Sequence, residues 1–428
     1  MIKILDGKLK NFDVTLDRLL SKRRSKIQFS SNSVKGIIDD VKKNGDRAIL
    51  KYERKFNNSN IIIPNPKQIS KSISSLEKKV KKAIDLAYTR IYKFHALQKV
   101  KNITYIDKLK NKLEYKYIPI ESVAIYVPGS SASYPSSVLM NAIPALIAGV
   151  KRIVMINPGQ KGKQNPAVLY AAKKCKIKEI YSIGGPSAIA SVAYGTKKIK
   201  KVDKIVGPGN LYVTAAKKEV FGDVGIEGMI AGPSEVTIVC DKFSNPEWIA
   251  SDLIGQAEHD NLAQCILISK DNSVIKKVNS EIINQLKELP RASIAKNSIL
   301  KNGILIHIAS DKKIIDLVNK IAPEHLELNI KNYKKLVDKI KNAGSICVGK
   351  YAVMAMTDYN VGSNHVLPTN SSARYSSGIS VNEFYKRISY INLSKKGIET
   401  LGPSVITLAN YEGLAGHAKS VEKRIRRK

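Results

Sequence analysis

Residues 123–129 read Val-Ala-Ile-Tyr-Val-Pro-Gly, a continuous apolar run that ends in a Pro-Gly turn. The same arrangement of apolar run, glycine-containing turn and helical pattern returns at 153–159, 180–185 and 205–209. Strands buried on both faces are continuous apolar runs, and their alternation with helices is typical of a parallel sheet. The stretch therefore predicts a doubly wound α/β sheet whose ligands bind beyond the carboxyl ends of its strands.

Periodic segments on both sides of this block indicate a second α/β unit. Apolar runs predict strands at 236–240, 304–308 and 345–348. Apolar residues at helical spacing predict helices at 34–56, 75–99, 248–259 and 274–289. The order of these elements predicts two incomplete Rossmann-like α/β domains, one inserted in the other, with small terminal accessory domains.

The expected domains have the following boundaries: 23–125 and 236–379 for a first α/β domain, 126–235 for an inserted Rossmann-like cofactor domain, 1–22 with 380–403 for an accessory domain, and 404–428 for a C-terminal segment. No Gly-x-Gly-x-x-Gly follows any predicted strand, so the usual dinucleotide fingerprint is absent. Gly207-Pro208-Gly209-Asn210 precedes a helix and could bring backbone amides close to a phosphate. Taken alone, these four residues are better explained as a plain turn.

The chain is strongly basic, with 72 Lys and Arg against 36 Asp and Glu and a net charge of +36. The excess is spread along the whole chain, and only 13 of the 72 basic residues are Arg. Base recognition and bidentate phosphate binding favour Arg, and no nucleic-acid-binding signature accompanies the charge. We therefore favour a Lys-rich solvated surface over a nucleic-acid site, also for the dense patches at 197–204 and 419–428.

Neither export nor membrane insertion is expected from the sequence. The first six residues lack the apolar core of a signal peptide, and prolines and serines interrupt the longest uncharged stretch, 122–150. We expect a cytoplasmic location. The four cysteines, Cys175, Cys240, Cys265 and Cys347, show no Cys-x-x-Cys spacing and are expected to be buried free thiols.

Six histidines are a small supply for 428 residues, and four of them stand in short polar clusters. The clusters are Gln256-Ala257-Glu258-His259-Asp260, Pro323-Glu324-His325, Gly362-Ser363-Asn364-His365 and Glu412 to His417. Only His95 and His307 lack such company. Imidazole is the commonest metal ligand and the usual general base near neutral pH, so the clusters indicate a metal-assisted active site.

Two of these clusters, with one further carboxylate, suggest a metal centre. Gln256 and His259 are three residues apart near the end of a predicted helix and so share a face. Asp358 adds a carboxylate and His417 a second imidazole, and two nitrogen and two oxygen donors suit zinc, with manganese or iron as alternatives. By itself, the pair on the helix is better explained as a capped helix end.

Adjacent polar side chains elsewhere allow two interpretations each. Glu324 could activate a water while His325 moves a proton, but a helix N-terminus with an exposed histidine explains the pair equally well. Ser234 is either a hydrogen-bond donor to a substrate or a turn residue before a strand. The same alternatives apply to Asn364 and His365.

The motifs taken together, in their order and spacing, resemble the histidinol dehydrogenase family. They are Tyr126-Val127-Pro128-Gly129, Gly207-Pro208-Gly209-Asn210, Ala231-Gly232-Pro233-Ser234-Glu235, Gln256-Ala257-Glu258-His259, Pro323-Glu324-His325-Leu326, Asp358-Tyr359, Asn364 to Thr369 and Glu412 to His417. The resemblance covers nearly the whole chain and is weakest over about the first 35 residues.

The resemblance implies a zinc enzyme that oxidises L-histidinol to L-histidine with two NAD, through histidinaldehyde, as the last step of histidine biosynthesis. It implies His325 as general base, Glu324 as the residue that activates water, and a homodimer with shared active sites, in which 404–428 complete the partner's site. The implied zinc ligands are Gln256, His259, Asp358 and His417. These four residues and His325 would also contact substrate, as would Ser234, His365 and Glu412. The implied cofactor contacts are Tyr126, Ser187 and Asn210.

Two positions depart from the family pattern. Ser187, in Gly-Gly-Pro-Ser-Ala-Ile, stands where the family commonly has Gln, and its shorter side chain has one hydroxyl in place of an amide. Thr357 stands where Gly usually precedes the metal-binding aspartate. The alternative functions are a zinc and NAD dehydrogenase of the same fold acting on another polyol or a hydroxy-sulfonate, and a non-catalytic nucleic-acid-binding protein.

Overall fold

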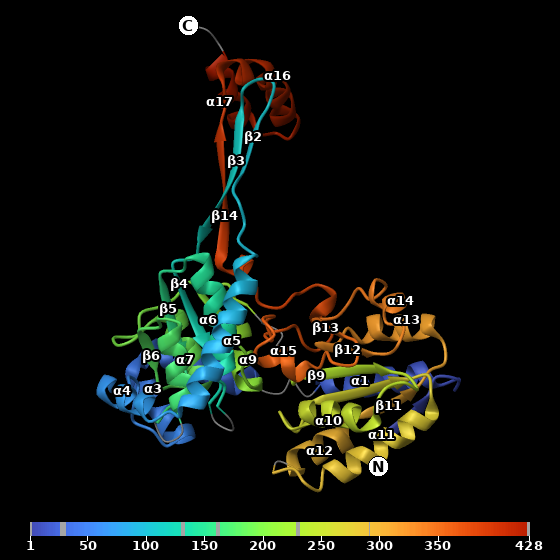
Figure 1. The fold of residues 1–428 in the computed structure, drawn as a ribbon. Coiled ribbons are helices and arrows are strands. Elements are labelled where there is room, and N and C mark those ends of the chain that lie inside the picture. The colour runs from blue at the N-terminus through green and yellow to red at the C-terminus, as the bar shows by residue number, and fades with distance from the viewer. Residues whose placement is uncertain are drawn as a thin grey trace.

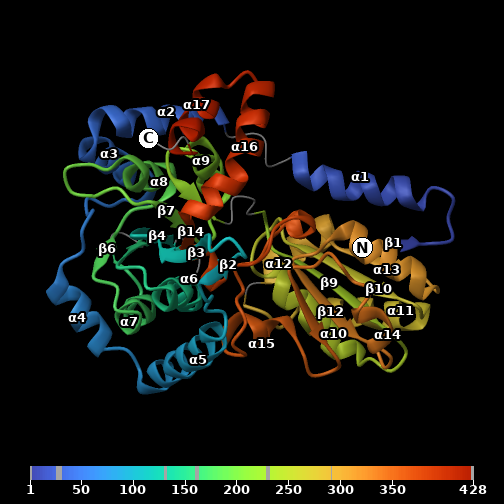
Figure 2. The same cartoon turned by 90° about the horizontal axis from the view of Figure 1, so that it is seen from above.

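The computed structural model describes residues 2–25, 31–129, 133–159, 163–227, 232–290 and 292–425. Within these residues the chain forms two α/β lobes that lie side by side, and a long arm rises from the lobe that contains β4 and α5 (Figure 1). The view from above shows that the two sheets belong to separate lobes, with α1 lying beside one of them (Figure 2).

One lobe contains a five-stranded parallel sheet in the order β6-β5-β4-β7-β8. Its strands are β4 (Ser122–Tyr126), β5 (Arg152–Ile156), β6 (Glu179–Tyr181), β7 (Lys204–Val206) and β8 (Gly225–Ile226). One face packs against α5 (Lys78–Ala96), α6 (Pro135–Ala148) and α7 (Pro166–Lys174). The other packs against α2 (Ser31–Asn44), α3 (Asp46–Asn57), α8 (Gly185–Tyr194) and α9 (Leu211–Glu219), and α4 (Pro66–Ser74) lies beside α7. The predicted parallel sheet, buried on both faces, is confirmed.

The other lobe contains a six-stranded parallel sheet in the order β1-β11-β10-β9-β12-β13. Its strands are β1 (Lys3–Asp6), β9 (Glu235–Cys240), β10 (Gln264–Ser269), β11 (Ile304–His307), β12 (His325–Asn329) and β13 (Ser345–Val348). The helices α10 (Pro246–Ala257), α11 (Asn272–Gln285) and α12 (Ala292–Asn302) cover one face. The helices α1 (Phe12–Ser25), α13 (Asp311–Ile321) and α14 (Lys334–Val337) cover the other.

The arm is a three-stranded antiparallel sheet in the order β14-β3-β2, formed by β2 (Ile103–Ile106), β3 (Lys112–Pro119) and β14 (Tyr385–Asn392). Its head consists of α16 (Lys395–Tyr411) and α17 (Ala415–Ile425), which stand far from both lobes (Figure 1). Asn111 joins the head to the arm, because its Oδ1 accepts a hydrogen bond of 3.0 Å from the backbone N–H of Ser394. Between the six-stranded lobe and the arm, the chain carries α15 (Met354–Tyr359) and two short 3₁₀ helices, Ser372–Arg374 and Val381–Phe384.

The predicted insertion of one α/β unit in the other is present, but several elements pair or pack with a different sheet from the one that the expected boundaries give them. The helices between residues 31 and 96 pack on the five-stranded sheet, not on the six-stranded one. Strand β1, expected in an accessory domain, pairs in parallel with β11. Strand β3, expected in the first α/β domain, pairs with β14 in the arm. Local periodicity predicts whether a segment is a strand or a helix. The sheet that the segment joins depends on contacts with residues far away in the sequence.

The predicted helix at 34–56 is two helices, because Gly45 adopts a positive φ of 51° between α2 and α3. All four cysteines are buried free thiols, as expected. Within the ranges given above, the structure contains no helix that is both long and apolar enough to cross a membrane.

Candidate functional site

Four of the expected metal and catalytic residues lie at the amino edge of the six-stranded sheet. Helix α10 runs back from the end of β9, so Gln256 in its last turn and His259 just beyond it reach the edge where the strands begin. Glu324 and His325 are at this same edge, where they open the buried strand β12. The alternative of a helix N-terminus with an exposed histidine is therefore wrong, because both side chains are buried.

The segment that begins with α15 brings Asp358 and His365 to the same place. The Nε2 atom of His325 lies 3.8 Å from Oδ1 of Asp358. His365 places Nδ1 at 2.8 Å from the backbone oxygen of Asp358 and Nε2 at 3.3 Å from Oγ of Ser137. Because Ser137 belongs to α6, His365 joins the two lobes. Ser137 was not a candidate from sequence, since nothing local distinguishes it from the neighbouring serines.

Glu324 is held in place by the start of the neighbouring strand. Its Oε2 accepts a hydrogen bond of 2.8 Å from the backbone N–H of Glu235. The side chain of Glu235 in turn accepts one of 2.6 Å from the backbone N–H of Asn370. The half-buried Ser234 directly precedes Glu235. A buried carboxylate, a serine and the His325 imidazole therefore share one edge of the sheet.

Three buried atoms here have no hydrogen-bond partner within the described part of the chain: Gln256 Oε1, Asp358 Oδ1 and His325 Nδ1. Burial raises the pKa of Asp358 to about 7 and lowers the pKa of His325 to about 3. Buried polar atoms without partners are costly, and a cation beside His259 would satisfy both oxygen atoms. No cluster of three or more His, Cys, Asp or Glu suited to a metal occurs among the described residues. The three expected ligands in this lobe, Gln256, His259 and Asp358, would supply a carboxamide, an imidazole and a carboxylate.

Asp252 and Glu327 form a buried carboxyl pair that the sequence analysis missed. Glu327 accepts a hydrogen bond of 2.7 Å from the backbone N–H of Met354, the first residue of α15, and its side chain is hydrogen-bonded to Asp252. Asp252 lies one turn before Gln256 on α10, and Glu327 lies two residues after His325 on β12. The pair therefore ties together the three elements that carry the site. The sequence did contain a signal for this pair. Asp252 is four residues before Gln256 on a helix, and Glu327 is two residues after His325 on a strand, so each shares a face with a candidate site residue.

Glu412 and His417 do not join this site within their own chain. Both are exposed at the head of the arm, away from α10 and α15 (Figure 1). Of the two histidines that stand outside the polar clusters, buried His95 lies next to the site, because its Nε2 is 3.3 Å from Nδ2 of Asn364, the neighbour of His365. Its Nδ1 lies 2.9 Å from the backbone oxygen of Ile91. His307 lies elsewhere, 3.7 Å from Asp6.

The expected cofactor residues lie at the carboxyl edge of the five-stranded sheet. Tyr126 ends β4, and its hydroxyl accepts a hydrogen bond of 3.2 Å from the backbone N–H of Gly185. Ser187 is buried, and its hydroxyl donates a hydrogen bond of 3.1 Å to the backbone oxygen of Gly184, the residue before α8. Asn210 is exposed and caps the N-terminus of α9. The neighbouring strands β4 and β7 mark the point where the sheet reverses its winding, which is where ligands of such sheets bind.

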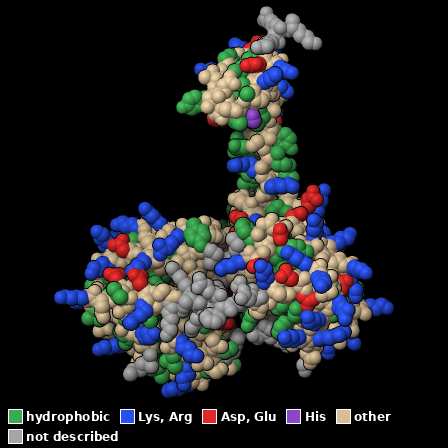
Figure 3. Space-filling model, turned by 180° about the vertical axis from the view of Figure 1, so that it is seen from behind, with side chains coloured by type: hydrophobic (Ala, Val, Ile, Leu, Met, Phe, Trp, Pro, Cys, Tyr) green, Lys and Arg blue, Asp and Glu red, His purple; other side chains and the backbone are tan. Residues whose placement is uncertain are grey.

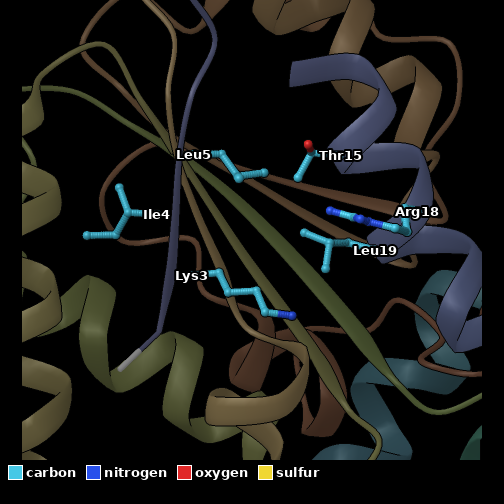
Figure 4. A pocket seen from close by; sticks show the side chains of 6 residues that line it. All are labelled: Lys3, Ile4, Leu5, Thr15, Arg18 and Leu19. Carbon is cyan, nitrogen blue, oxygen red and sulfur yellow. The ribbon is translucent and has the colours of Figure 1, made fainter. Parts of the chain in front are cut away.

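A groove of about 480 Å³ lies elsewhere, between β1 and α1 (Figure 4). Lys3 and Leu5 point across it toward α1, whereas Ile4 points the other way. The lining residues are Lys3, Ile4, Leu5, Thr15, Arg18 and Leu19. They include no carboxylate, imidazole or thiol, so this groove lacks the groups for metal-assisted or acid-base chemistry.

The family model described as histidinol dehydrogenase matches residues 20–425. The chain belongs to the histidinol dehydrogenase family. It is 86% identical to a histidinol dehydrogenase of Pelagibacter ubique over the full length of both chains. It is 43% identical to one from Nitrosomonas europaea, with 99% of this chain and 100% of that protein covered. As a member of the histidinol dehydrogenase family, it is an oxidoreductase.

Structural similarity supports the same membership. The crystal structure of histidinol dehydrogenase from Elizabethkingia anophelis superposes with a TM-score of 0.90 at 37% identity, covering 99% of this chain and 98% of that one. An acetylating aldehyde dehydrogenase from Geobacillus thermoglucosidasius, at 13% identity and a TM-score of 0.50, covers 90% of this chain and 99% of its own. This second similarity shows a shared fold alone.

The carboxyl pair below the site predicts a pH-dependent stability. Burial raises the pKa of Glu327 to about 8, so between about pH 4.5 and 8 the folded protein binds more protons than the unfolded chain. Stability should therefore fall as the pH rises through this window. Glu327→Gln keeps the acceptor for Met354 but cannot ionise, and should reduce that fall by on the order of 1–3 kcal/mol.

Denaturant unfolding at about pH 5 and pH 8 measures the difference in unfolding free energy. Glu247→Gln, an exposed change on α10, is the control, and equal falls in all three proteins would contradict the prediction.

Proposed function

We propose that this enzyme oxidises L-histidinol to L-histidine, through histidinaldehyde and with the reduction of two NAD, as the last step of histidine biosynthesis. The observation that carries the proposal is the contact between His325 and Asp358, next to Gln256 Oε1 and Asp358 Oδ1, two buried oxygen atoms that lack hydrogen-bond partners within the described residues. His259 lies close enough to His325 to help lower the pKa of that imidazole. The 86% identical relative bears the name histidinol dehydrogenase over its full length, which supports the choice of substrate.

Zinc is the proposed metal, held by Gln256, His259 and Asp358 together with His417 of the partner subunit. Two oxygen and two nitrogen donors suit a four-coordinate zinc site that can accept further ligands. When bound, zinc would mainly orient the substrate through its imidazole and amine. Besides these four residues, Ser234, His325 and His365 are proposed to contact substrate, as is Glu412 of the partner subunit.

The residues at the start of β12 are proposed to perform the proton transfers. Burial keeps His325 neutral, which is the form that can accept the proton lost with each hydride. Glu324 activates the water that hydrates the aldehyde, and its bond to the Glu235 backbone fixes the direction of its carboxylate. All four cysteines are buried, so direct attack by water fits the site better than a thiol nucleophile.

NAD, which supplies the hydride acceptor in both oxidations, is proposed to bind at the carboxyl edge of the five-stranded sheet. Tyr126, Ser187 and Asn210 converge there from β4, α8 and α9. Asn210 is exposed, so its side-chain amide is accessible to a ligand. The contact between Ser137 and His365 brings the helix that follows β4 against the proposed substrate site.

A homodimer with shared sites is proposed because the arm exposes much apolar surface. Figure 3 shows hydrophobic side chains gathered along the arm and its head, and such a surface needs a partner. The exposed apolar residues of this part include Ile103, Tyr105, Ile106, Leu113, Ile391, Leu393, Leu401, Val405, Leu408, Tyr411 and Leu414. In a twofold dimer each arm would cover the partner and bring Glu412 and His417 to its site.

Zinc removal should abolish histidinol oxidation while the fold remains. Both sheets have apolar cores that do not depend on a metal, so metal-stripped protein should keep its circular dichroism spectrum. The zinc-loaded protein should form about two NADH per histidinol consumed, measured by absorbance against histidine produced. Full activity after verified metal removal would overturn the zinc proposal, and lack of NADH formation by the zinc-loaded protein would overturn the substrate.

The two proposed roles at β12 predict different losses in the two half-reactions. Glu324→Gln should slow the oxidation of histidinaldehyde by roughly 10²-fold or more and the oxidation of histidinol far less, since only the aldehyde needs water. His325→Asn should slow both. Single-turnover measurements with each substrate separate the steps. Equal losses in the two steps for the Glu324 variant would contradict the division of roles.

A shared site predicts that two inactive variants can restore activity to each other. His259→Asn and His417→Asn each remove one proposed ligand, but in a mixed dimer one of the two sites has all four wild-type ligands while the other carries both defects. After complete subunit exchange at equal amounts, about a quarter of wild-type activity should return.

The control for this experiment is wild-type protein taken through the same exchange, which should stay active. Mixed dimers, identified with two affinity tags, are assayed after purification. If purified mixed dimers remain inactive while the exchanged wild-type dimers are active, the site is not shared and His417 acts in its own subunit.

A further inference from the structure

Lys217, on α9, is a fully buried lysine that the proposed function does not use. Only 1% of the residue is exposed, and its ammonium group donates a hydrogen bond to the backbone oxygen of Gly207. Burial lowers the pKa of Lys217 to about 8. A buried ammonium is costly, and an apolar side chain of the same length would fill this space at lower cost. The lysine therefore needs an explanation other than packing.

The ammonium group has no ion-pair partner of its own in the described residues. Glu227 opposes the effect of burial on Lys217, but its carboxylate is paired with Lys204 at 3.1 Å. Lys204 also donates a hydrogen bond of 2.6 Å to the backbone oxygen of Glu383. Within the described residues, the ammonium group of Lys217 donates a hydrogen bond to Gly207, so its direct contact is with the backbone of the turn after β7.

That turn, Gly207 to Asn210, is tightly confined at both ends. Gly207 has a φ of 100°, and a Cβ at this position would collide with the backbone oxygen of Tyr126. The turn therefore packs directly on the end of β4. At its other end, Asn210 Oδ1 accepts a hydrogen bond of 3.1 Å from the backbone N–H of Val213 and so fixes the start of α9. The hydrogen bond from Lys217 adds a further constraint, on the carbonyl group of Gly207.

We propose that Lys217 is a positioning residue of the cofactor site, which holds the Gly207–Asn210 turn against Tyr126 in the shape that binds NAD. The inference rests on the proposed function, because it takes NAD to bind at this edge of the sheet. The ammonium acts through the Gly207 carbonyl and does not itself touch the cofactor. Burying the ammonium group costs stability. The turn is already ordered when NAD binds, which lowers the entropy cost of binding.

Lys217→Met tests the proposal, with the exposed neighbour Lys218→Met as matched control. Loss of a hydrogen bond from a charged donor should weaken NAD binding by about 10-fold or more in Lys217→Met, measured by calorimetry without histidinol. The KM for histidinol and kcat at saturating NAD should stay within about twofold of wild type. The thermal unfolding midpoint should not fall, because an apolar side chain replaces a buried charge. Lys218→Met should match wild type in all four measurements.

The outcomes separate this proposal from the function on which it rests. Unchanged NAD affinity in Lys217→Met, with binding intact in wild type, would overturn the role of Lys217 alone. A lower unfolding midpoint together with weaker binding of both NAD and histidinol would assign Lys217 to the stability of the fold and also overturn the proposal. Absence of NAD binding in wild type and in Lys218→Met would overturn the cofactor proposal itself, and the role of Lys217 with it.

Discussion

The structure of the candidate site depends on one segment, residues 358–370, which is hydrogen-bonded to both lobes. The backbone N–H of Asn370 binds the Glu235 carboxylate at the start of β9, while His365 reaches Ser137 on α6. Neither lobe alone contains the proposed acid-base residues, the proposed metal ligands and the expected cofactor contacts. This segment joins the lobe of the six-stranded sheet to the lobe of the five-stranded sheet, because it satisfies polar groups on both sides.

The two groups of candidate residues lie at opposite edges of the two sheets. The five-stranded sheet follows the usual rule for doubly wound folds, with its candidate ligand residues beyond the carboxyl ends of the strands. The six-stranded sheet instead presents Glu324 and His325 at its amino edge, where the end of α10 also arrives. A strand start within a buried sheet holds these side chains rigidly, which a solvent-exposed helix terminus would not do.

Several ionisable side chains in this molecule are buried, which costs free energy of folding. Burial raises the pKa of Asp358, Asp252 and Glu327 and lowers the pKa of His325 and Lys217. All five lie at or below the two candidate sites, not in the apolar cores of the lobes. Strongly shifted groups of this kind are concentrated at functional sites, since preorganised charge costs stability. The exposed apolar side chains of the arm also carry a free-energy cost, because they contact water in an isolated chain.

The sequence by itself determined the parallel sheets, the insertion of one unit in the other and the placing of four of the six histidines in short polar clusters. Continuous apolar runs and helical spacing are local signals, and the order of the motifs identified the family. Only the tertiary structure assigned β1 and the helices of residues 31–96 to their sheets, separated His417 from His259, and joined Asp252 to Glu327. These features depend on contacts between residues far apart in the chain, and such partners are selected by shape and burial, which no local pattern encodes.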